Sequence, residues 1–249
     1  MSMNKKKIEK IDISLVTWNR PDITKKCIEA IEKSTIHPYR LIVIDNGSKQ
    51  ETRDLLWNLY TEKKIDLLVL LEKNYGLEYA KNVGLSYVKS KYHISTDNDL
   101  IPQVGWLGRL IDLMDKNPKY AAIACRTQVM IGTGNIYDKK EKQDIVEFPH
   151  PGGSLRIMRT DFVKAAGGWR DDEPLRGSEE KHICSKLHEM GYKTGFAVKV
   201  KCYHMFGKDE NWGYGKLKPE KHGHTPVWHP AIQGGDNEED MNKWLNEKI

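Results

Sequence analysis

The sequence predicts an α/β fold with a mostly parallel central sheet, and three observations support this prediction. Short apolar segments alternate with helical segments of roughly a dozen residues through the first part of the chain. The apolar segments 41–44 and 67–71 are nearly continuous runs of Leu, Ile and Val, which is typical of strands buried on both faces. Polar turns that contain Asn, Asp or Gly follow these segments.

The first half of the chain is predicted to supply the parallel strands, which span residues 11–16, 41–44, 67–71 and 92–96. Helical spacing of apolar residues follows Pro21 and recurs at 55–59 and 80–88. Pro21 suits the first position of a helix because its missing N–H would have no partner there. This order of elements predicts three helices that connect parallel strands.

The second half is predicted to be less regular. Its expected elements are a helix at 107–114, a strand at 121–126, a hairpin or loop at 132–142, a strand at 153–158, a short helix from Thr160 and a strand at 195–200. A longer helix is expected from Ser178 to Gly191, because Ser favours helix starts and Gly favours helix ends. Its inward face is expected to carry Ile183, Leu187 and Met190.

Length and composition indicate one globular domain with a tail. The chain has 249 residues, of which 30% are charged, so it belongs with soluble globular proteins and not with disordered ones. We place the domain at 8–207, with two halves that divide at about residue 101. Residues 208–249 are rich in Gly, Pro, Lys, His and Trp with little periodicity, and we interpret them as a lid or tail.

The net charge of +5 fits an acidic ligand such as a nucleoside diphosphate, or a peripheral contact with anionic lipid headgroups. It does not require nucleic acid as a partner. No C-x-x-C pair occurs among the four cysteines, so we expect reduced, mostly buried thiols. The sequence shows no secretory signal and no apolar run long enough to span a membrane, which together predict a cytoplasmic protein.

The Asp97-Asn98-Asp99 triplet is the first candidate site, because it ends an apolar strand with paired carboxylates. Asp is rare in strands and is costly to bury without a partner. Two carboxylates in this position can hold a divalent cation and the hydroxyls or phosphates of a ligand. A solvated turn before Pro102 is the alternative, and the triplet alone favours it. However, Asn19 and Asp45 also follow strands, and ligands of such sheets bind at these strand ends.

The turn after the first strand argues for a metal site. A dinucleotide site would need a glycine-rich turn there, whereas the sequence has Thr17-Trp18-Asn19-Arg20. A lysine-containing phosphate loop is also missing, so a diphosphate would be held through a metal bound by Asp97 and Asp99. His204, at the end of a late strand, is a plausible third ligand suited to Mn²⁺. A core or surface histidine remains the alternative.

Taken together, several motifs resemble glycosyltransferases of family 2, which have the GT-A fold. These motifs are Leu15 to Arg20, Val43 to Ser48, Asn74 to Gly84, Asp97 to Asp99, Gly177 to Glu180, Lys186-Leu187 and His204. The resemblance implies a Rossmann-like, mostly parallel sheet flanked by helices, with a smaller sheet on the acceptor side. Residues 8–101 would bind the nucleotide sugar, and residues 102–207 would hold the acceptor and the catalytic base.

The resemblance also implies a role for each site residue. Thr17, Asn19 and Arg20 would line the nucleotide pocket, and Asp45 would accept a hydrogen bond from the base, typically uracil. Asn74, Gly76 and Lys81 would follow the base, ribose or sugar diphosphate, where the family usually has Arg in place of Lys81. Asp97 and Asn98 would face the ribose and sugar. Asp99 would bind Mn²⁺ (or Mg²⁺) with His204 and Asp97.

The catalytic base is expected at Glu179-Glu180, since the family usually has Glu-Asp at the start of this helix. Glu180 falls at the position of the base, and Glu179 is the alternative. His182 stands where a further Asp usually follows. Acidic residues in a first helical turn also suit the helix dipole, so a purely structural role is the competing interpretation.

The resulting hypothesis is an inverting, metal-dependent glycosyltransferase that moves a sugar from a nucleoside-diphosphate sugar to a hydroxyl of a glycan or glycoconjugate. UDP-sugars are favoured on the resemblance alone. The alternatives are a non-catalytic nucleotide-sugar-binding protein of the same fold and a sugar nucleotidyltransferase. Weaker candidates are Arg156 and Arg159 in the acceptor site, and Lys208 and Trp212 in a lid.

Overall fold

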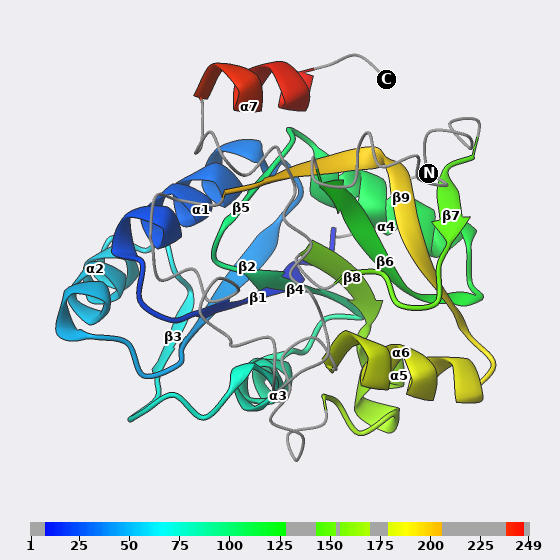
Figure 1. Ribbon diagram of the computed structural model, residues 1–249, viewed down its shortest axis with the longest axis horizontal. Coiled ribbons are helices and arrows are strands. Elements are labelled where there is room, and N and C mark those ends of the chain that lie inside the picture. Colours follow the sequence, from blue (N-terminus) through cyan, green and yellow to red (C-terminus); the bar gives the residue numbers. More distant parts are fainter. Residues whose placement is uncertain (1–7, 128–142, 153–154, 170–178, 206–237, 247–249) are drawn as a thin grey trace, which may run out of the picture.

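The chain folds as three layers, with a sheet between two groups of helices (Figure 1). The computed structural model describes residues 8–127, 143–152, 155–169, 179–205 and 238–246. One face of the sheet is covered by helices α1, α2 and α4, and the other by α3, α5 and α6. This arrangement confirms the predicted α/β fold.

The first half forms the parallel part of the sheet, in the order β3-β2-β1-β4. Its strands are β1 (Ile11–Thr17), β2 (Tyr39–Asp45), β3 (Leu67–Leu70) and β4 (Tyr92–Asp97). The connecting helices are α1 (Pro21–Ser34), α2 (Gln50–Thr61) and α3 (Leu77–Tyr87). All seven elements lie where the sequence predicts them, because long apolar segments and clear turns mark them.

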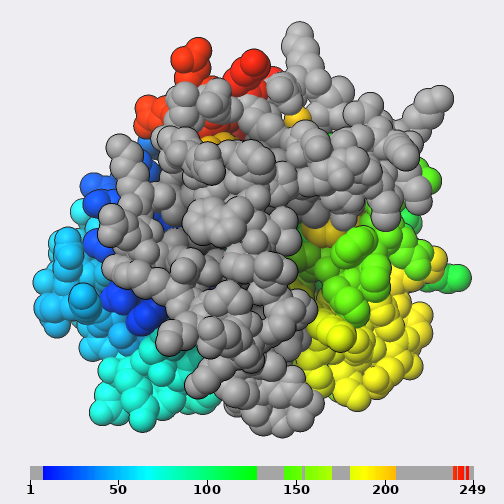
Figure 2. Space-filling model, in the orientation of Figure 1, coloured from blue at the N-terminus to red at the C-terminus, as the bar shows by residue number. Residues whose placement is uncertain are grey.

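The second half extends the same sheet. Its elements are β5 (Leu100–Pro102), α4 (Trp106–Lys116), β6 (Tyr120–Thr127), β7 (Ile145–Glu147), β8 (Leu155–Arg159), α5 (Thr160–Ala165), α6 (Glu179–Glu189), β9 (Lys193–His204) and α7 (Glu238–Asn246). Strand β8 is antiparallel to both β4 and β6, and so joins the two halves. The long strand β9 pairs with β6 and then with β5, so the strands of the second half are hydrogen-bonded to the main sheet. The two halves lie side by side on the face shown in Figure 2.

Three elements are missing from the sequence prediction. Strands β5 and β7 have three residues each, which is too short for a periodic signal, and Pro102 further obscures β5. Helix α7 lies in the segment interpreted as a lid or tail, and it packs Met241 and Leu245 against the core. These two residues are four positions apart, which is the spacing of one helix face and the signal in the sequence that could have predicted α7.

Two other predictions concern the second half of the chain. Met190 was predicted to face inward, but 40% of it is exposed, because α6 ends one residue earlier at Glu189. The predicted hairpin at 132–142 and the capping residue Ser178 lie outside the described residues.

Close packing of α3 on β1 is the feature of the core that matters most for the site. A Cβ at Gly84 would lie 2.1 Å from the Oγ of Ser14, so only glycine permits this approach. All four cysteines are buried and free, as expected. Within the described ranges, no helix has both the length and the apolar character that crossing a membrane requires.

Candidate functional site

The loops after β1 and β2 are bound to one another at the carboxyl end of the sheet. Asn19 donates its backbone N–H to Ser48 Oγ at 2.7 Å, and its Oδ1 accepts from the backbone N–H of Lys49 at 2.9 Å. Asn19 and Arg20 both have left-handed backbone angles, with φ of 56° and 57°. Such conformations are strained for residues other than glycine, and strain of this kind is concentrated at functional sites.

Asp99 lies at the centre of a small buried cluster between β4 and β5. Arg20 Nη1 is 3.1 Å from its Oδ2, and His204 Nε2 is 3.3 Å from its Oδ1. His204 reaches this position because it pairs with Leu100 across the antiparallel β5–β9 strands. The backbone N–H of Met205 also donates to the carbonyl of Asp99 at 2.8 Å. The structure therefore brings Arg20, Asp99 and His204 together.

The cluster alters the charges of its members. Burial alone would raise the pKa of Asp99, but His204 and Arg20 outweigh it and hold that pKa below its usual value. Burial alone would lower the pKa of His204, but the carboxylates of Asp99 and Asp97 raise it above its usual value. Both groups therefore favour their charged forms, and the site concentrates charge in a dry environment.

Asp97 belongs to a second group with Lys81 and Glu180. Lys81 Nζ lies 4.0 Å from Asp97 Oδ1 and 3.5 Å from Glu180 Oε1. Burial raises the pKa of Asp97 to about 7, helped by Asp99 and Glu180 and opposed by Lys81 and His204. The three residues come from β4, α3 and α6, so the first and second halves of the chain meet at this ion-pair group.

Some predicted nucleotide-binding side chains point into the protein. Asn98 donates to the hydroxyl oxygens of Thr17, at 3.1 Å, and Thr24, at 2.7 Å. The carboxylate of Asp45 is fully buried, accepts from the backbone N–H of Ser48, and lies 3.3 Å from Arg53 Nε. These contacts hold the loops in shape.

The loop before α3 is organised around Asn74 and Gly76. Asn74 Oδ1 accepts from the backbone N–H of Gly76 at 2.9 Å and from Asn46 Nδ2 at 3.0 Å. Gly76 has φ of 97° and precedes α3, so it supplies the turn that begins this helix. The structure therefore places both residues beside the β2 loop, at the predicted edge of the nucleotide pocket.

The residues present fit a divalent metal at Asp99 and His204. The Oδ1 atoms of Asp97 and Asp99 are buried and accept no hydrogen bond of good geometry from the described residues, although Lys81 Nζ lies near Asp97 and His204 Nε2 near Asp99. Carboxylate oxygen with imidazole nitrogen suits Mn²⁺. The described part of the chain holds no preformed group of three such ligands, and Asp97 points instead to Lys81. Further ligands would have to come from substrate or water.

Arg156, a weaker candidate, is completely buried beneath α6. Its Nη1 donates to the carbonyl of Pro151 at 3.4 Å, while Nε and Nη2 make no hydrogen bond of good geometry to a described residue. Arg159 is better satisfied, because its guanidinium donates to the carbonyls of Tyr120 and Met114 at 2.9 and 2.7 Å. Neither side chain is exposed on the surface of the strand.

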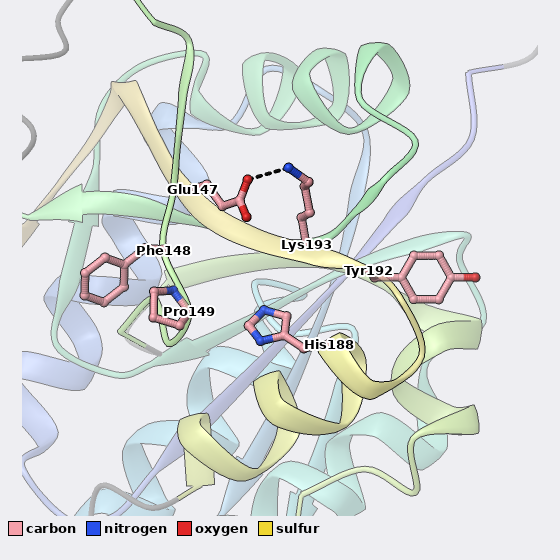
Figure 3. A pocket seen from close by; sticks show the side chains of 6 residues that line it. All are labelled: Glu147, Phe148, Pro149, His188, Tyr192 and Lys193. Carbon is pink, nitrogen blue, oxygen red and sulfur yellow. Dashed lines mark hydrogen bonds and ion pairs between the residues drawn. The ribbon is translucent and has the colours of Figure 1, made fainter.

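Other predictions fall outside this cluster or outside the described residues. The segments with Lys208 and Trp212 are not described, and neither is the side chain of Glu179. A separate hollow of about 470 Å³ lies beside β9 and the end of α6 (Figure 3). Its lining contains none of the predicted site residues, and His188 in it is roughly 12 Å along α6 from Glu180.

Asn82 is a residue of this region to which the sequence assigns no role. Its Nδ2 donates to the carbonyl of Trp169 at 2.6 Å, and its Oδ1 accepts from the backbone N–H of Trp169 at 2.8 Å. Asn82 belongs to the motif that precedes Gly84, but its partner lies 87 positions further along the chain. Local pattern gives no signal of such a pairing.

Comparison with known proteins identifies the family. Residues 12–170, more than half of the chain, match the family described as glycosyl transferase family 2. Chondroitin synthase of Escherichia coli is 26% identical over 222 residues, which cover 83% of this chain but 32% of that protein. A chondroitin synthase of Pasteurella multocida is 29% identical over 113 residues, which cover 43% of this chain and 11% of that protein. The chain thus spans less than a third of these two relatives.

Solved structures agree on the fold. The mannosyltransferase PcManGT from Pyrobaculum calidifontis, in complex with GDP-Man and Mn²⁺, matches 78% of this chain and 56% of its own with a TM-score of 0.67 and 20% identity. GalNAc-T7 with UDP, GalNAc and Mn²⁺ matches 80% of this chain and 44% of its own with a TM-score of 0.67 and 15% identity. The fold is therefore that of GT-A glycosyltransferases, and the chain is a member of glycosyl transferase family 2.

Proposed function

We propose that this chain is an inverting, metal-dependent glycosyltransferase that moves a sugar from a nucleoside-diphosphate sugar to a hydroxyl of a glycan or glycoconjugate. One observation carries the proposal: carboxylates from distant parts of the chain converge at the end of the parallel strands. Asp97 ends β4 and Asp99 follows two residues later, and the ammonium of Lys81 links Asp97 to Glu180 at the start of α6. This supplies a donor-binding group and a candidate base in one place.

In this proposal the diphosphate lies at the β1 loop. Arg20 and the backbone around Asn19 would contact phosphate or ribose, with Thr17 and Asn98 holding the loop in position. Asn74 and Gly76 would follow the base and ribose. Asp45 retains its predicted role toward the base, although the base could reach its buried carboxylate only after a shift of the turn at 45–48.

Asp99 and His204 would hold Mn²⁺ or Mg²⁺, with Asp97 facing the ribose and the transferred sugar. A bound divalent metal stabilises the negative charge that develops on a departing diphosphate. The complexes of PcManGT and GalNAc-T7 both contain Mn²⁺, which supports this choice of metal. Charged Arg20 would add to the same stabilisation.

Glu180 would accept the proton of the acceptor hydroxyl. It lies in the first turn of α6, where the helix dipole favours a negative charge, and the ammonium of Lys81 lies 3.5 Å from it. An ionised carboxylate in this place can act as a general base. The acceptor oxygen would attack the anomeric carbon from the side opposite the diphosphate, and the configuration would be inverted.

We favour a UDP-sugar as donor. The support is the UDP in the GalNAc-T7 complex, although the PcManGT complex contains GDP-Man. A glycan acceptor is supported by the chondroitin synthases among the relatives. Both assignments are tested by incubation with a panel of UDP- and GDP-sugars, Mn²⁺ and oligosaccharide acceptors. The expected product is free nucleoside diphosphate, whereas pyrophosphate would indicate a nucleotidyltransferase.

Variants separate catalysis from binding. Asp99→Asn should abolish Mn²⁺-dependent nucleotide binding, measured by calorimetry. Glu180→Gln should spare that binding and reduce transfer by at least about 10²-fold. If Glu180→Gln transfers sugar normally and Glu179→Gln does not, Glu179 is the base. NMR of the glycosidic product should show inversion, and a retained anomeric configuration would refute the mechanism.

A further inference from the structure

Two consecutive residues of α3, Lys81 and Asn82, contact the acceptor half of the chain. Helix α3 itself is fixed on the donor half, because Gly84 permits close contact with Ser14 of β1. It therefore provides a rigid surface from which the two side chains extend toward α6 and the turn after α5, on the same face of the sheet. Their partners are different, and each contact is an independent observation.

Lys81 is buried, with 2% of its surface exposed. Its Nζ lies 3.5 Å from Glu180 and 4.0 Å from Asp97, and within the described residues it has no hydrogen bond of good geometry. A buried ammonium is costly unless opposite charges lie close to it. The two carboxylates provide that compensation, so their positions and that of Lys81 depend on one another.

Asn82 binds the turn that follows α5. Its side-chain amide pairs with both backbone groups of Trp169, at 2.6 and 2.8 Å. Gly168 has φ of 75°, and a Cβ there would lie 2.4 Å from Asn82 Oδ1, so the turn approaches α3 as closely as a backbone can. The turn and α6 pack in one apolar cluster through Trp169, Ile183 and Leu187. Asn82 thereby fixes the part of the acceptor half on which α6 rests.

We propose that Lys81 and Asn82 are positioning residues that set the location of Glu180 relative to Asp97. Lys81 fixes the carboxylate of Glu180 directly, and Asn82 fixes the structure under α6. This inference rests on the proposed function, in which Glu180 is the base. A displacement of about 1 Å at a reacting group can reduce the rate by roughly 10²-fold, so a structural contact of this kind can control turnover.

Kinetics of Asn82→Ala provide the first test, because the side-chain amide of Asn82 is hydrogen-bonded to Trp169, which is not a predicted donor-binding residue. We expect kcat to fall by at least about tenfold, while the donor KM and the affinity for UDP with Mn²⁺ change less than about threefold. Lys89→Met, an exposed position just after α3, serves as the control and should retain wild-type values. A loss of donor affinity equal to the loss of kcat would refute the assignment of Asn82.

A double-mutant cycle tests Lys81. Arginine at this position reaches further than lysine, and Glu180→Asp shortens the carboxylate side chain by one methylene. We expect Lys81→Arg and Glu180→Asp each to reduce kcat. If the two changes acted independently, the double variant would show the product of the two reductions; we expect its kcat to be at least about fivefold higher than that value. Fully independent effects would refute the coupling.

Crystal structures of wild type, Lys81→Met and Asn82→Ala give a test that does not depend on turnover. We expect the carboxylate of Glu180 to move away from Asp97 by about 1 Å or more in each variant. An unmoved Glu180 in both variants would refute the inference even if activity is lost. If the wild-type protein transfers no sugar but Glu180 moves as expected, the proposed function fails and the positioning role stands.

Discussion

Arg20 Nη1 lies 3.1 Å from Asp99 Oδ2, so a cationic side chain already neutralises the carboxylate that is proposed to hold the metal. Only 15% of the Arg20 side chain and 9% of the Asp99 side chain are exposed. The pair is therefore largely desolvated, and in this setting opposite charges interact more strongly than they do in water. A metal bound to Asp99 and the guanidinium of Arg20 would compete for the negative charge of the same carboxylate.

This competition predicts opposite effects of Arg20→Met on two ligands. Mn²⁺ alone should bind more tightly, by about threefold or more, because Asp99 Oδ2 becomes free. UDP in the presence of Mn²⁺ should bind more weakly, because a cationic group near the diphosphate is lost. Calorimetric titration with each ligand measures both effects, and weaker binding of Mn²⁺ alone would contradict the prediction.

Because Gly84 and Ser14 are in close contact, we expect a substitution of Ser14 to restore stability that is lost on substitution of Gly84. Gly84→Ala should destabilise the protein by about 1–3 kcal/mol, because the added Cβ would lie 2.1 Å from Ser14 Oγ. Ser14→Ala removes that oxygen, so the double variant should regain part of the lost stability. Urea unfolding measures all three variants, and a double variant less stable than Gly84→Ala would show that the conflict lies elsewhere.

Arg156 predicts a stabilising substitution. Its guanidinium is fully buried, and two of its nitrogens make no hydrogen bond of good geometry within the described residues. Replacing a poorly compensated buried charge by an apolar side chain commonly raises stability. Arg156→Met should raise Tm by roughly 2–4 °C for each kcal/mol gained. Arg159→Met is the matched control, and it should lower Tm because Arg159 is well hydrogen-bonded. A lower Tm in both variants would show that Arg156 has a stabilising partner.

His93 predicts a loss of stability in acid. Burial, together with a smaller effect of the charge of Arg156, lowers the pKa of His93 to about 3. The unfolded chain takes up a proton near the usual pKa of 6.5, whereas the folded protein does not until about 3. The contribution of His93 to the free energy of unfolding is thus fully present above pH 6.5. It declines as the pH falls toward about 3, by at most about 1.4 kcal/mol per pH unit.

His93→Phe should reduce that slope by up to about 1 kcal/mol per unit between pH 6 and pH 5. The measurement is urea unfolding at several pH values. His37→Phe is the control, because His37 is not buried and should leave the slope unchanged. An equal slope in wild type and His93→Phe would contradict the prediction.

Much of the fold follows from local signals in the sequence. The parallel strands are long apolar segments between clear turns, and their boundaries agree with prediction to within a few residues. The end of β4 at Asp97 follows from the same pattern. Asp99 and Arg20 of the buried cluster could be singled out from the sequence, because both lie in turns that directly follow strands.

The remaining features depend on contacts between distant parts of the chain. The short strands β5 and β7 exist because each pairs with β9, and a three-residue segment carries no signal of a partner. The inward orientation of Asn98 is set by Thr17 and Thr24, which lie more than seventy positions away. Spacing and composition contain no information about such pairs.

Strand β9 has a consequence for how the molecule can be divided. It is the last strand of the sheet in the chain, yet it lies between β6 and β5 and brings His204 to Leu100, about a hundred residues earlier. Contacts of such long range form late in folding. The carboxylate of Asp99 therefore gains its imidazole partner only after the C-terminal strand has joined the sheet. Residues 8–101, expressed alone, would lack half of the proposed metal site and could not serve as an independent nucleotide-binding module.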